Sequence, residues 1–321
     1  MKIIVTGSAG FIGSHLVGLL AKDAQNQIVG IDNLNPSYGS KWSNFRMKSQ
    51  SELDNFEFRN LDLVHMSPIE LGEIFRGAHS VIHLAAWPGV RTSQRIPHEY
   101  SKSNLTGFGN VLEAVRLSEP SQFLFASSSS IYGDLGSNGP VRESDATGKN
   151  VKSYYAATKW ANEVLAQSHQ AITKVPTAAL RFFTVYGEAG RPDMAYWTFL
   201  EKIRNSEAID LYGKTGGSRN FTYIKDAVEI IRRIVSIDLE GFSALNIAAG
   251  QPIETIDFVN TIASIANRPL NINIIERPGV DVEKTWADLT KLNQLIGQIA
   301  PTSIEVGLNN FYNWFEKNSL K

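Results

Sequence analysis

The chain of 321 residues is longer than a single hydrophobic core usually supports, so we expect one large domain with a smaller companion. Its composition is that of a globular protein, with 43% hydrophobic residues, 20% charged residues and a net charge of −1, which argues against a nucleic-acid partner. No cysteine is present, which excludes disulfides, thiolate nucleophiles and thiolate metal sites, and we expect no metal.

The N-terminus is predicted to belong to the fold itself. Its apolar run ends at once at Gly7 and Gly10 and is too short for the core of a signal peptide. No apolar run approaches the roughly 20 residues of a membrane span. We therefore expect a cytoplasmic protein without a membrane partner.

The first element is the β-branched run Ile3–Val5, which predicts a strand buried on both faces of a parallel sheet. The glycines Gly7, Gly10 and Gly13 follow, and residues 14–20 have helical periodicity. This order of strand, glycine turn and helix lets the backbone approach a pyrophosphate, whose charge then lies at the helix N-terminus. The pattern is typical of a dinucleotide site.

A second strand is predicted at Gln27–Ile31, and it ends at Asp32. An acidic residue about 20 positions beyond the glycines suits a ribose diol and repels a 2′-phosphate. NAD is therefore favoured over NADP as the cofactor.

Two further strands are predicted at residues 56–63 and 80–86. Asp62 ends the first, where it could meet an adenine or instead cap the next helix. His83 lies within the second, and beside an apolar strand we interpret it as a structural histidine. Small residues at the end of that strand would let a cofactor lie against the backbone.

A helix with a broad apolar stripe is predicted over residues 104–117, followed by a strand at 122–126. That strand delivers the serines Ser127–Ser130 at its carboxyl end, where open α/β sheets bind ligands. The polar segment 133–151 could be a mobile rim of the site or a surface loop.

The next predicted helix, residues 153–172, carries Tyr155 and Lys159. Residues four apart lie on one helical face, with Cα atoms roughly 6 Å apart along the axis. A free tyrosine has a pKa of about 10, and a nearby ammonium together with a cationic cofactor ring could lower it toward 7. The pair therefore predicts a phenolic base, completed by a serine that hydrogen-bonds the reacting hydroxyl.

The alternation of strands and helices ends after another strand, 177–183, so we place the end of the first domain at residue 187. The fold class is α/β, with residues 1–187 forming a Rossmann-type doubly wound parallel sheet. Residues 188–321 would mainly form a smaller α/β substrate domain. Parts of 221–250 could return to the first domain, which would make the second one discontinuous.

Several motifs together resemble the extended short-chain dehydrogenase/reductase family of nucleotide-sugar enzymes, over nearly the whole chain. They are GSAGFIG at 7–13, HLAA at 83–86, NxxGxxNVLEA at 104–114, SSSSIYG at 127–133, YYAATK at 154–159, RFFTVYG at 181–187, GRPDMA at 190–195 and RNFTYIKD at 219–226. Within this family the likeness is strongest to the UDP-glucuronate 4-epimerase branch.

The resemblance implies an NAD-dependent nucleotide-sugar epimerase in which Tyr155 is the base, Lys159 lowers its pKa and Ser128 supplies the catalytic hydroxyl. It implies cofactor contacts by Gly7, Gly10, Phe11, Ile12, Gly13, Asp32, Asn33, Asp62, Leu63, Leu84, Ala85, Ala86, Asn104, Tyr155 and Lys159. It implies substrate contacts by Pro88, Ser128, Ser129, Thr184, Arg191, Arg219, Arg277 and Asp281.

The residues of the serine run distinguish 4-epimerisation from the other reactions of the family. Related 4,6-dehydratases and uronate decarboxylases carry acidic residues where this chain has Ser129 and Ser130. The resemblance thus implies 4-epimerisation between UDP-glucuronate and UDP-galacturonate, with Thr184 and Arg191 holding the sugar carboxylate. Arg191 could instead form a surface salt bridge.

Two alternatives remain, a 4-epimerase of another hexose such as UDP-glucose or a UDP-N-acetylhexosamine, and a UDP-glucuronate decarboxylase. The chain departs from the family pattern at Trp87–Pro88, at Asn220 and Lys225, and at residues 277–281, which are one residue longer than usual. The resemblance also implies a homodimer formed by the helices that carry Asn104 and Tyr155.

Overall fold

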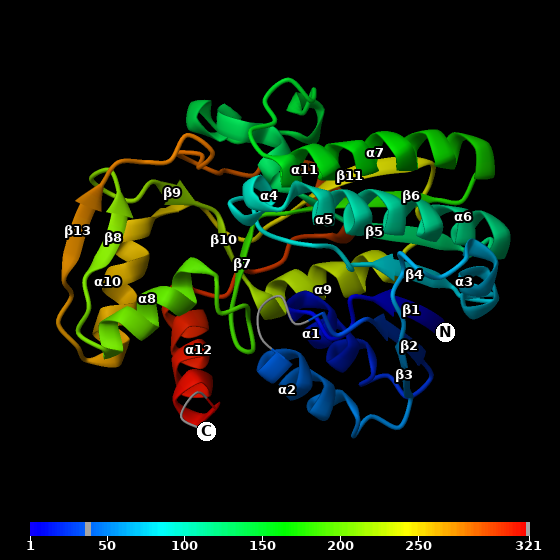
Figure 1. Ribbon diagram of the computed structural model, residues 1–321, viewed down its shortest axis with the longest axis horizontal. Coiled ribbons are helices and arrows are strands. Elements are labelled where there is room, and N and C mark those ends of the chain that lie inside the picture. The colour runs from blue at the N-terminus through cyan, green and yellow to red at the C-terminus, as the bar shows by residue number, and fades with distance from the viewer. Residues whose placement is uncertain (36–39, 319–321) are drawn as a thin grey trace.

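Seven parallel strands form the central sheet, in the order β11-β6-β5-β4-β1-β2-β3 (Figure 1). The computed structural model describes residues 1–35 and 40–318. The strands of this sheet are β1 (Lys2–Thr6), β2 (Gln27–Asp32), β3 (Phe56–Asn60), β4 (Ser80–His83), β5 (Gln122–Ser128), β6 (Thr177–Phe182) and β11 (Phe242–Ile247).

Strand order reverses beside β1, whose neighbours are β2 on one side and β4 on the other. Thr6 pairs with Ile31 of β2 and with His83 of β4, so the three strands end level with one another. In open α/β sheets, ligands bind in the crevice outside the carboxyl ends at this switch point. The predicted Rossmann-type fold is confirmed.

Helices cover both faces of the sheet (Figure 1). On one face α1 (Phe11–Leu20) and α9 (Ile224–Val235) pack together, and their apolar residues join one large core cluster. On the other face lie α3 (Pro68–Phe75), α6 (Phe108–Ser118) and α7 (Tyr154–Thr173). Strands enclosed by two helical layers need apolar side chains on both faces, as the runs in the sequence indicated.

A smaller lobe lies at one side of the sheet (left in Figure 1). It contains the parallel pair β8 (Ile209–Tyr212) and β13 (Ile272–Ile275), with α8 (Ala195–Arg204), α10 (Thr255–Ala266) and α12 (Ile304–Asn318) packed around it.

The remaining elements lie between the two lobes or beside the carboxyl ends of the strands. They are α2 (Ser40–Gln50), α4 (Thr92–Arg95), α5 (Pro97–Ser101), a π-helix (Lys102–Gly107), 3-10 segments (Ser129–Asn138 and Glu143–Asp145), β7 (Thr184–Tyr186), β9 (Ser218–Arg219), β10 (Phe221–Tyr223), β12 (Ile253–Glu254) and α11 (Thr290–Ile296).

Three predicted elements differ in extent from the observed ones. The strands predicted at 56–63 and 80–86 end at Asn60 and His83, because the following residues leave the sheet at its carboxyl edge. The helix predicted from residue 104 begins with the π-helix at Lys102. The segment 133–151 is held in place by Val141, which is buried and forms a bridge with Ala287.

Segments beyond residue 187 do contribute to the larger sheet. Phe242–Ile247 is its edge strand β11 and pairs with β6 along its whole length. Phe221–Tyr223 pairs with β7 in a separate two-stranded sheet. The boundary after residue 187 stays a prediction. No helix in the residues that the structure covers is both long and apolar enough to cross a bilayer.

A buried ion pair joins α7 to the sheet. The guanidinium of Arg181 on β6 donates to both carboxylate oxygens of Glu163 at 2.9 and 2.7 Å, and both side chains are at most 5% exposed. Ser127 at the end of β5 donates to the same carboxylate at 2.5 Å. The ion pair therefore fixes α7 to β6, and the Ser127 bond fixes α7 to the end of β5, where the serine run begins.

We predict that Glu163→Gln destabilises the fold by about 3–5 kcal/mol, since it leaves the Arg181 cation buried without its partner. Urea unfolding would measure this change. Glu113→Gln, which breaks the exposed pair with Arg116, is the matched control and should change stability little. Equal small effects of the two variants would contradict the prediction.

Candidate active site

A cavity of about 640 Å³ lies outside the carboxyl ends of the sheet strands. Seventeen of the residues named from the sequence line it: Gly7, Gly10, Phe11, Ile12, Gly13, Asp32, Asn33, Asp62, Leu63, Leu84, Ala85, Ala86, Pro88, Ser128, Tyr155, Lys159 and Arg191. These residues make up a little under half of the cavity wall.

The loop between β1 and α1 is too tightly packed for side chains. A Cβ at Gly13 would lie 2.1 Å from the carbonyl oxygen of Gly7, and one at Gly7 would lie 2.7 Å from the backbone nitrogen of Ala85. Gly7 also has a φ of +73°, which favours glycine. Gly10 caps α1 without any side-chain hydrogen bond, so the first N–H groups of the helix are available to a ligand. This loop fits a dinucleotide pyrophosphate.

Two acidic residues follow the glycine loop around the cavity. Asp32 accepts hydrogen bonds from the backbone N–H groups of Ala9 and Leu34 at 3.0 and 2.8 Å, which fixes its carboxylate at the end of β2. Asp62 accepts from Asn33 Nδ2 at 3.0 Å and from the Val64 N–H at 2.9 Å. The cap of the next helix is Ser67, so Asp62 does not fill that role.

The candidate catalytic groups come together at the ends of β5 and α7. The Lys159 ammonium donates to the Ala126 carbonyl at 2.8 Å and lies 5.9 Å from the centre of the Tyr155 ring. Ser130 donates to Ser128 through both its N–H and its hydroxyl, at 3.2 and 2.9 Å. These two bonds hold Ser128 and Ser130 close together within the serine loop.

Burial raises the pKa of Tyr155, while a hydrogen bond from Ser128 and the positive charge of Arg191 act in the opposite direction. Burial also lowers the pKa of Lys159 to about 8. The sequence argument expected a lowered pKa for Tyr155, and the protein alone does not provide it. The ammonium is held mainly by Ala126, and a cationic cofactor ring would have to supply the additional stabilisation of the phenolate.

His83 lies in the sheet and not among the groups that line the cavity. It is 3% exposed, and its Nδ1 shares a 2.8 Å hydrogen bond with the Thr6 hydroxyl. Burial lowers its pKa to about 3, with the charge of Lys159 as a further cause. A neutral, buried imidazole of this kind matches the structural interpretation.

Arg191 has two sets of contacts. It lines the cavity near Tyr155, and it also forms a bidentate ion pair with Asp193 at 3.0 and 2.6 Å. Thr184 begins β7 and does not line the cavity, and the same is true of Ser129. The structure thus brings only Arg191 of these three to the candidate sugar position.

The other predicted substrate contacts form a separate group on the side of the smaller lobe. Arg219 and Arg277 both donate to the Val282 carbonyl, at 2.7 and 3.0 Å. Asp281 pairs with Arg91 at 2.5 Å. Burial lowers the pKa of Arg219 to about 10, and repulsion from Arg277 adds to the effect. Two adjacent guanidinium groups of this kind would favour a diphosphate.

Asn104 does not line the cavity either. Its amide accepts from the Trp87 N–H at 2.7 Å and donates to the Trp87 carbonyl and to Thr158, each at 3.1 Å. It therefore supports the cavity wall at Trp87. Asn220, which replaces an aspartate usual in the family, donates to the carbonyls of Ala249 and Gly250, which a carboxylate could not do.

Sequence reasoning missed several residues of the cavity wall, among them Trp42, Arg46, Glu99, Lys102 and Thr106. Trp42 and Arg46 lie on α2, a helix that was not identified because its pattern has no clear apolar face. The other three belong to α5 and to the π-helix, whose extra residue per turn shifts the side chains that face the cavity.

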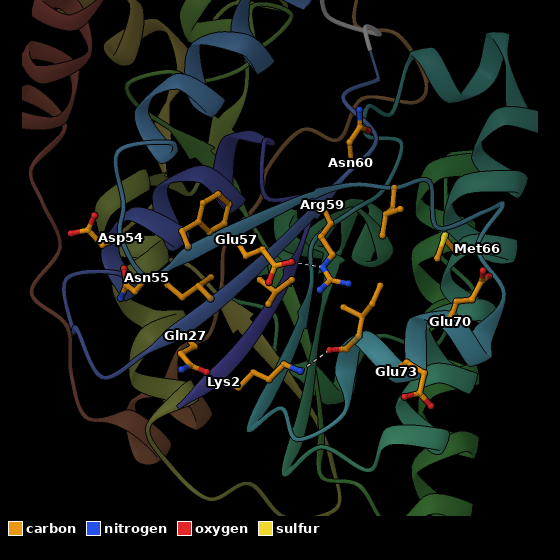
Figure 2. Close-up of a pocket in the computed structure, with 15 residues that line it drawn as sticks. Lys2, Gln27, Asp54, Asn55, Glu57, Arg59, Asn60, Met66, Glu70 and Glu73 are labelled. Carbon is orange, nitrogen blue, oxygen red and sulfur yellow. Dashed lines mark hydrogen bonds and ion pairs between the residues drawn. The ribbon is translucent and has the colours of Figure 1, made fainter.

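Figure 2 shows a second hollow, of about 910 Å³, between the edge strand β3 and α3. Its basic side chains already have partners: Lys2 donates to the Ile74 carbonyl at 2.8 Å, and Arg59 pairs with Glu57 at 2.7 Å. It also includes the amino ends of β1 and β2, away from the carboxyl edge. We therefore place the active site in the first cavity. In the described part of the chain, no group of three or more His, Asp or Glu could hold a metal ion.

Residues 3–248 match the model of the NAD dependent epimerase/dehydratase family. The chain belongs to this family. A probable UDP-glucuronate 4-epimerase of Rhizobium meliloti is 34% identical over 99% of this chain and 98% of its own length. A UDP-glucuronate 4-epimerase of Thermodesulfobacterium geofontis is 33% identical over 98% and 96%.

Among solved structures, the UDP-glucuronic acid 4-epimerase of Bacillus cereus in complex with UDP-glucuronic acid and NAD is similar to this chain, with a TM-score of 0.92. The sequences are 29% identical, and the match covers 99% of each chain. The prediction of an NAD-dependent nucleotide-sugar epimerase of the extended short-chain dehydrogenase/reductase type is confirmed. NAD is the family's cofactor, and the glycine loop with Asp32 fits it.

We predict that Tyr155→Phe lowers kcat at least about 10³-fold, because it removes the phenolic oxygen that we expect to accept the proton. The bound NAD should stay at the wild-type level, since the ring is kept. Tyr154→Phe is a matched control, as this neighbouring tyrosine is exposed and its hydroxyl shares a hydrogen bond with Ser101. Turnover and NAD content of both variants would be measured, and an active Tyr155→Phe would rule out Tyr155 as the base.

Proposed function

We propose that the chain interconverts UDP-glucuronate and UDP-galacturonate by NAD-dependent 4-epimerisation. The observation that carries the proposal is the presence of Arg191 in the same cavity as Ser128, Tyr155 and Lys159. A guanidinium near the reacting groups suits an anionic sugar. The relatives and the solved structure of this name, matched over nearly their whole length, support the choice of substrate.

In this proposal Tyr155, as phenolate, takes the proton of the sugar 4-hydroxyl while the hydrogen at C4 leaves as hydride. NAD, which the glycine loop and Asp32 would hold, would supply the hydride acceptor and the later hydride donor. Ser128 hydrogen-bonds the 4-oxygen and keeps it aligned with the phenol. Lys159 stabilises the phenolate, because a positive charge favours the ionised form. The 4-keto sugar turns about its diphosphate before the hydride returns.

The cationic group on the smaller lobe has the chemistry to hold that diphosphate. Arg219 and Arg277 converge on one carbonyl, and their mutual repulsion would be relieved by an anion between them. Asp281 would then contact the ribose. This assignment leaves the sugar free to rotate while the nucleotide stays bound.

The intermediate of a uronate is a β-keto acid, which can lose CO2. Decarboxylation requires the bond from C5 to the carboxylate to align with the ketone π system. Arg191, which lines the cavity, would hold the carboxylate out of this alignment. Positions 129 and 130 are serines, so this part of the loop offers no carboxylate for another reaction.

A second candidate is 4-epimerisation of a neutral hexose such as UDP-glucose or a UDP-N-acetylhexosamine. The bidentate pair between Arg191 and Asp193 favours it, since a guanidinium already bound to a carboxylate attracts a second one less strongly. In this case Arg191 would only support its loop.

We expect purified enzyme, given UDP-glucuronate and no added NAD, to form UDP-galacturonate until a stable mixture is reached, as followed by NMR. Arg191→Met should raise KM for UDP-glucuronate at least about tenfold, because it removes a charge-assisted contact. A pentose product would mean decarboxylation. Turnover of UDP-glucose alone, indifferent to Arg191→Met, would establish the second candidate instead.

We further propose that the chain is a homodimer and acts in the cytoplasm. Apolar side chains are exposed on two neighbouring helices, with Leu117 on α6 and Val164, Leu165 and Ile172 on α7 each at least 43% exposed. Such a surface commonly marks a protein interface.

Sedimentation at micromolar concentration should therefore give twice the monomer mass. Replacing Val164 and Leu165 with Glu should yield monomers, because the charges would be desolvated at the interface. Ile69→Glu, at an exposed apolar residue of α3, is the control. A wild-type monomer would refute the proposal.

A further inference from the structure

Arg46 on α2 is a buried cation without a carboxylate in hydrogen-bonding distance among the described residues. It is 7% exposed and lines the cavity. Within the described part of the chain, its three hydrogen bonds all go to backbone carbonyls. A buried charge usually has a charged partner, so an arginine held only by carbonyls indicates a specific role.

The three carbonyls belong to two different loops. Arg46 donates to Ala9 in the glycine loop at 3.3 Å, and to Ala189 and Gly190 at 2.8 and 2.9 Å. The next residue after Gly190 is Arg191. One planar guanidinium thus joins the loop that fits the cofactor to the loop that carries the candidate sugar contact.

Both loops depend on support from α2. Gln50, one helical turn beyond Arg46, donates to the Ser8 carbonyl at 2.8 Å and is 1% exposed. On the other side, Ala189 has a φ of +50°, a region that residues with a Cβ rarely adopt. A strained backbone persists only where its surroundings hold it, and Arg46 bonds directly to this residue.

The charges around Arg46 also lie where the glycine loop meets the loop that carries Arg191. Burial lowers the pKa of Arg46 to about 10, and the positive charge of Arg191 adds to this effect, while Tyr196 and Asp32 act in the opposite direction. Arg46, Arg191 and the N-terminus of α1 each bring positive charge to the cavity wall, where Asp32 is an opposing charge. Anions of the cofactor and of the sugar would both be stabilised there.

We propose that Arg46 is a positioning residue that locks the glycine loop and the Arg191 loop into one unit, so that NAD and the sugar carboxylate are bound by parts that move together. The inference rests on the proposed function, in which Arg191 contacts the sugar. Its effect is on binding, because Arg46 contacts none of the groups that transfer the proton.

Kinetics of Arg46→Met, Arg191→Met and the double variant test the proposal. Arg46→Met should raise KM for UDP-glucuronate about tenfold, a typical loss for a charged hydrogen-bonding group, with kcat at saturating NAD within about twofold. In the Arg191→Met background the same change should raise KM no further, since the loop then has no sugar contact to position. Lys48→Met, an exposed residue of the same helix, is the matched control.

Retained cofactor is the second readout. After gel filtration, Arg46→Met should keep less NAD than wild type and Lys48→Met, measured after release from the denatured protein. If Arg46→Met does not fold, the same measurements are made on Arg46→Lys. Its ammonium cannot span three carbonyls, so it should show the same changes at smaller size.

The proposal is wrong if Arg46→Met leaves both KM and NAD content at the control level, if it lowers kcat alone, or if its effect on KM is the same with and without Arg191. An unchanged KM in Arg191→Met would instead refute the proposed sugar contact. In that case a loss of NAD in Arg46→Met would support the link to the glycine loop, and normal retention would overturn it.

Discussion

The attachment of α7 to the carboxyl end of β5 is the constraint on which the site depends. Tyr155, Lys159 and Glu163 recur every four residues and so lie on one face of the helix. Lys159 bonds to Ala126, and Glu163 accepts from Ser127 while paired with Arg181. The helix that carries Tyr155 and the serine loop are therefore held by adjacent buried bonds. A phenol can serve as a base only where its partners are fixed in this way, since catalysis depends on preorganised geometry.

The part of the cavity that fits the cofactor is likewise fixed by backbone geometry. Thr6, Ile31 and His83 end level, which places the glycine loop next to residues 84–86. Close packing at Gly7 and Gly13 leaves room for a pyrophosphate but not for side chains. Parallel strands that end together thus create the crevice, and the residues just beyond them provide its chemistry.

The sequence predicted the sheet, the cofactor cavity and the groups around Tyr155 because each rests on local spacing or on a strand end. Contacts that join distant segments could not be predicted in this way. Arg46 bonds to residues 37 and 144 positions away, in a helix with no apolar pattern. The pairing of Arg191 with Asp193, and of Asp281 with Arg91, depends on loop conformations that no periodicity encodes. The raised pKa of Tyr155 also reflects burial, which spacing alone does not specify.

The central claim is that the hydrogen at C4 of the sugar leaves as hydride and returns within the same closed cycle, while Tyr155 moves only the hydroxyl proton. Turnover of UDP-glucuronate in D2O, followed by mass spectrometry and NMR of the product, tests this most directly. The account predicts UDP-galacturonate without deuterium at C4 or C5. Deuterium at C4 would contradict hydride return. Deuterium at C5 would show that the site lets the keto intermediate enolise, contrary to a firmly held carboxylate.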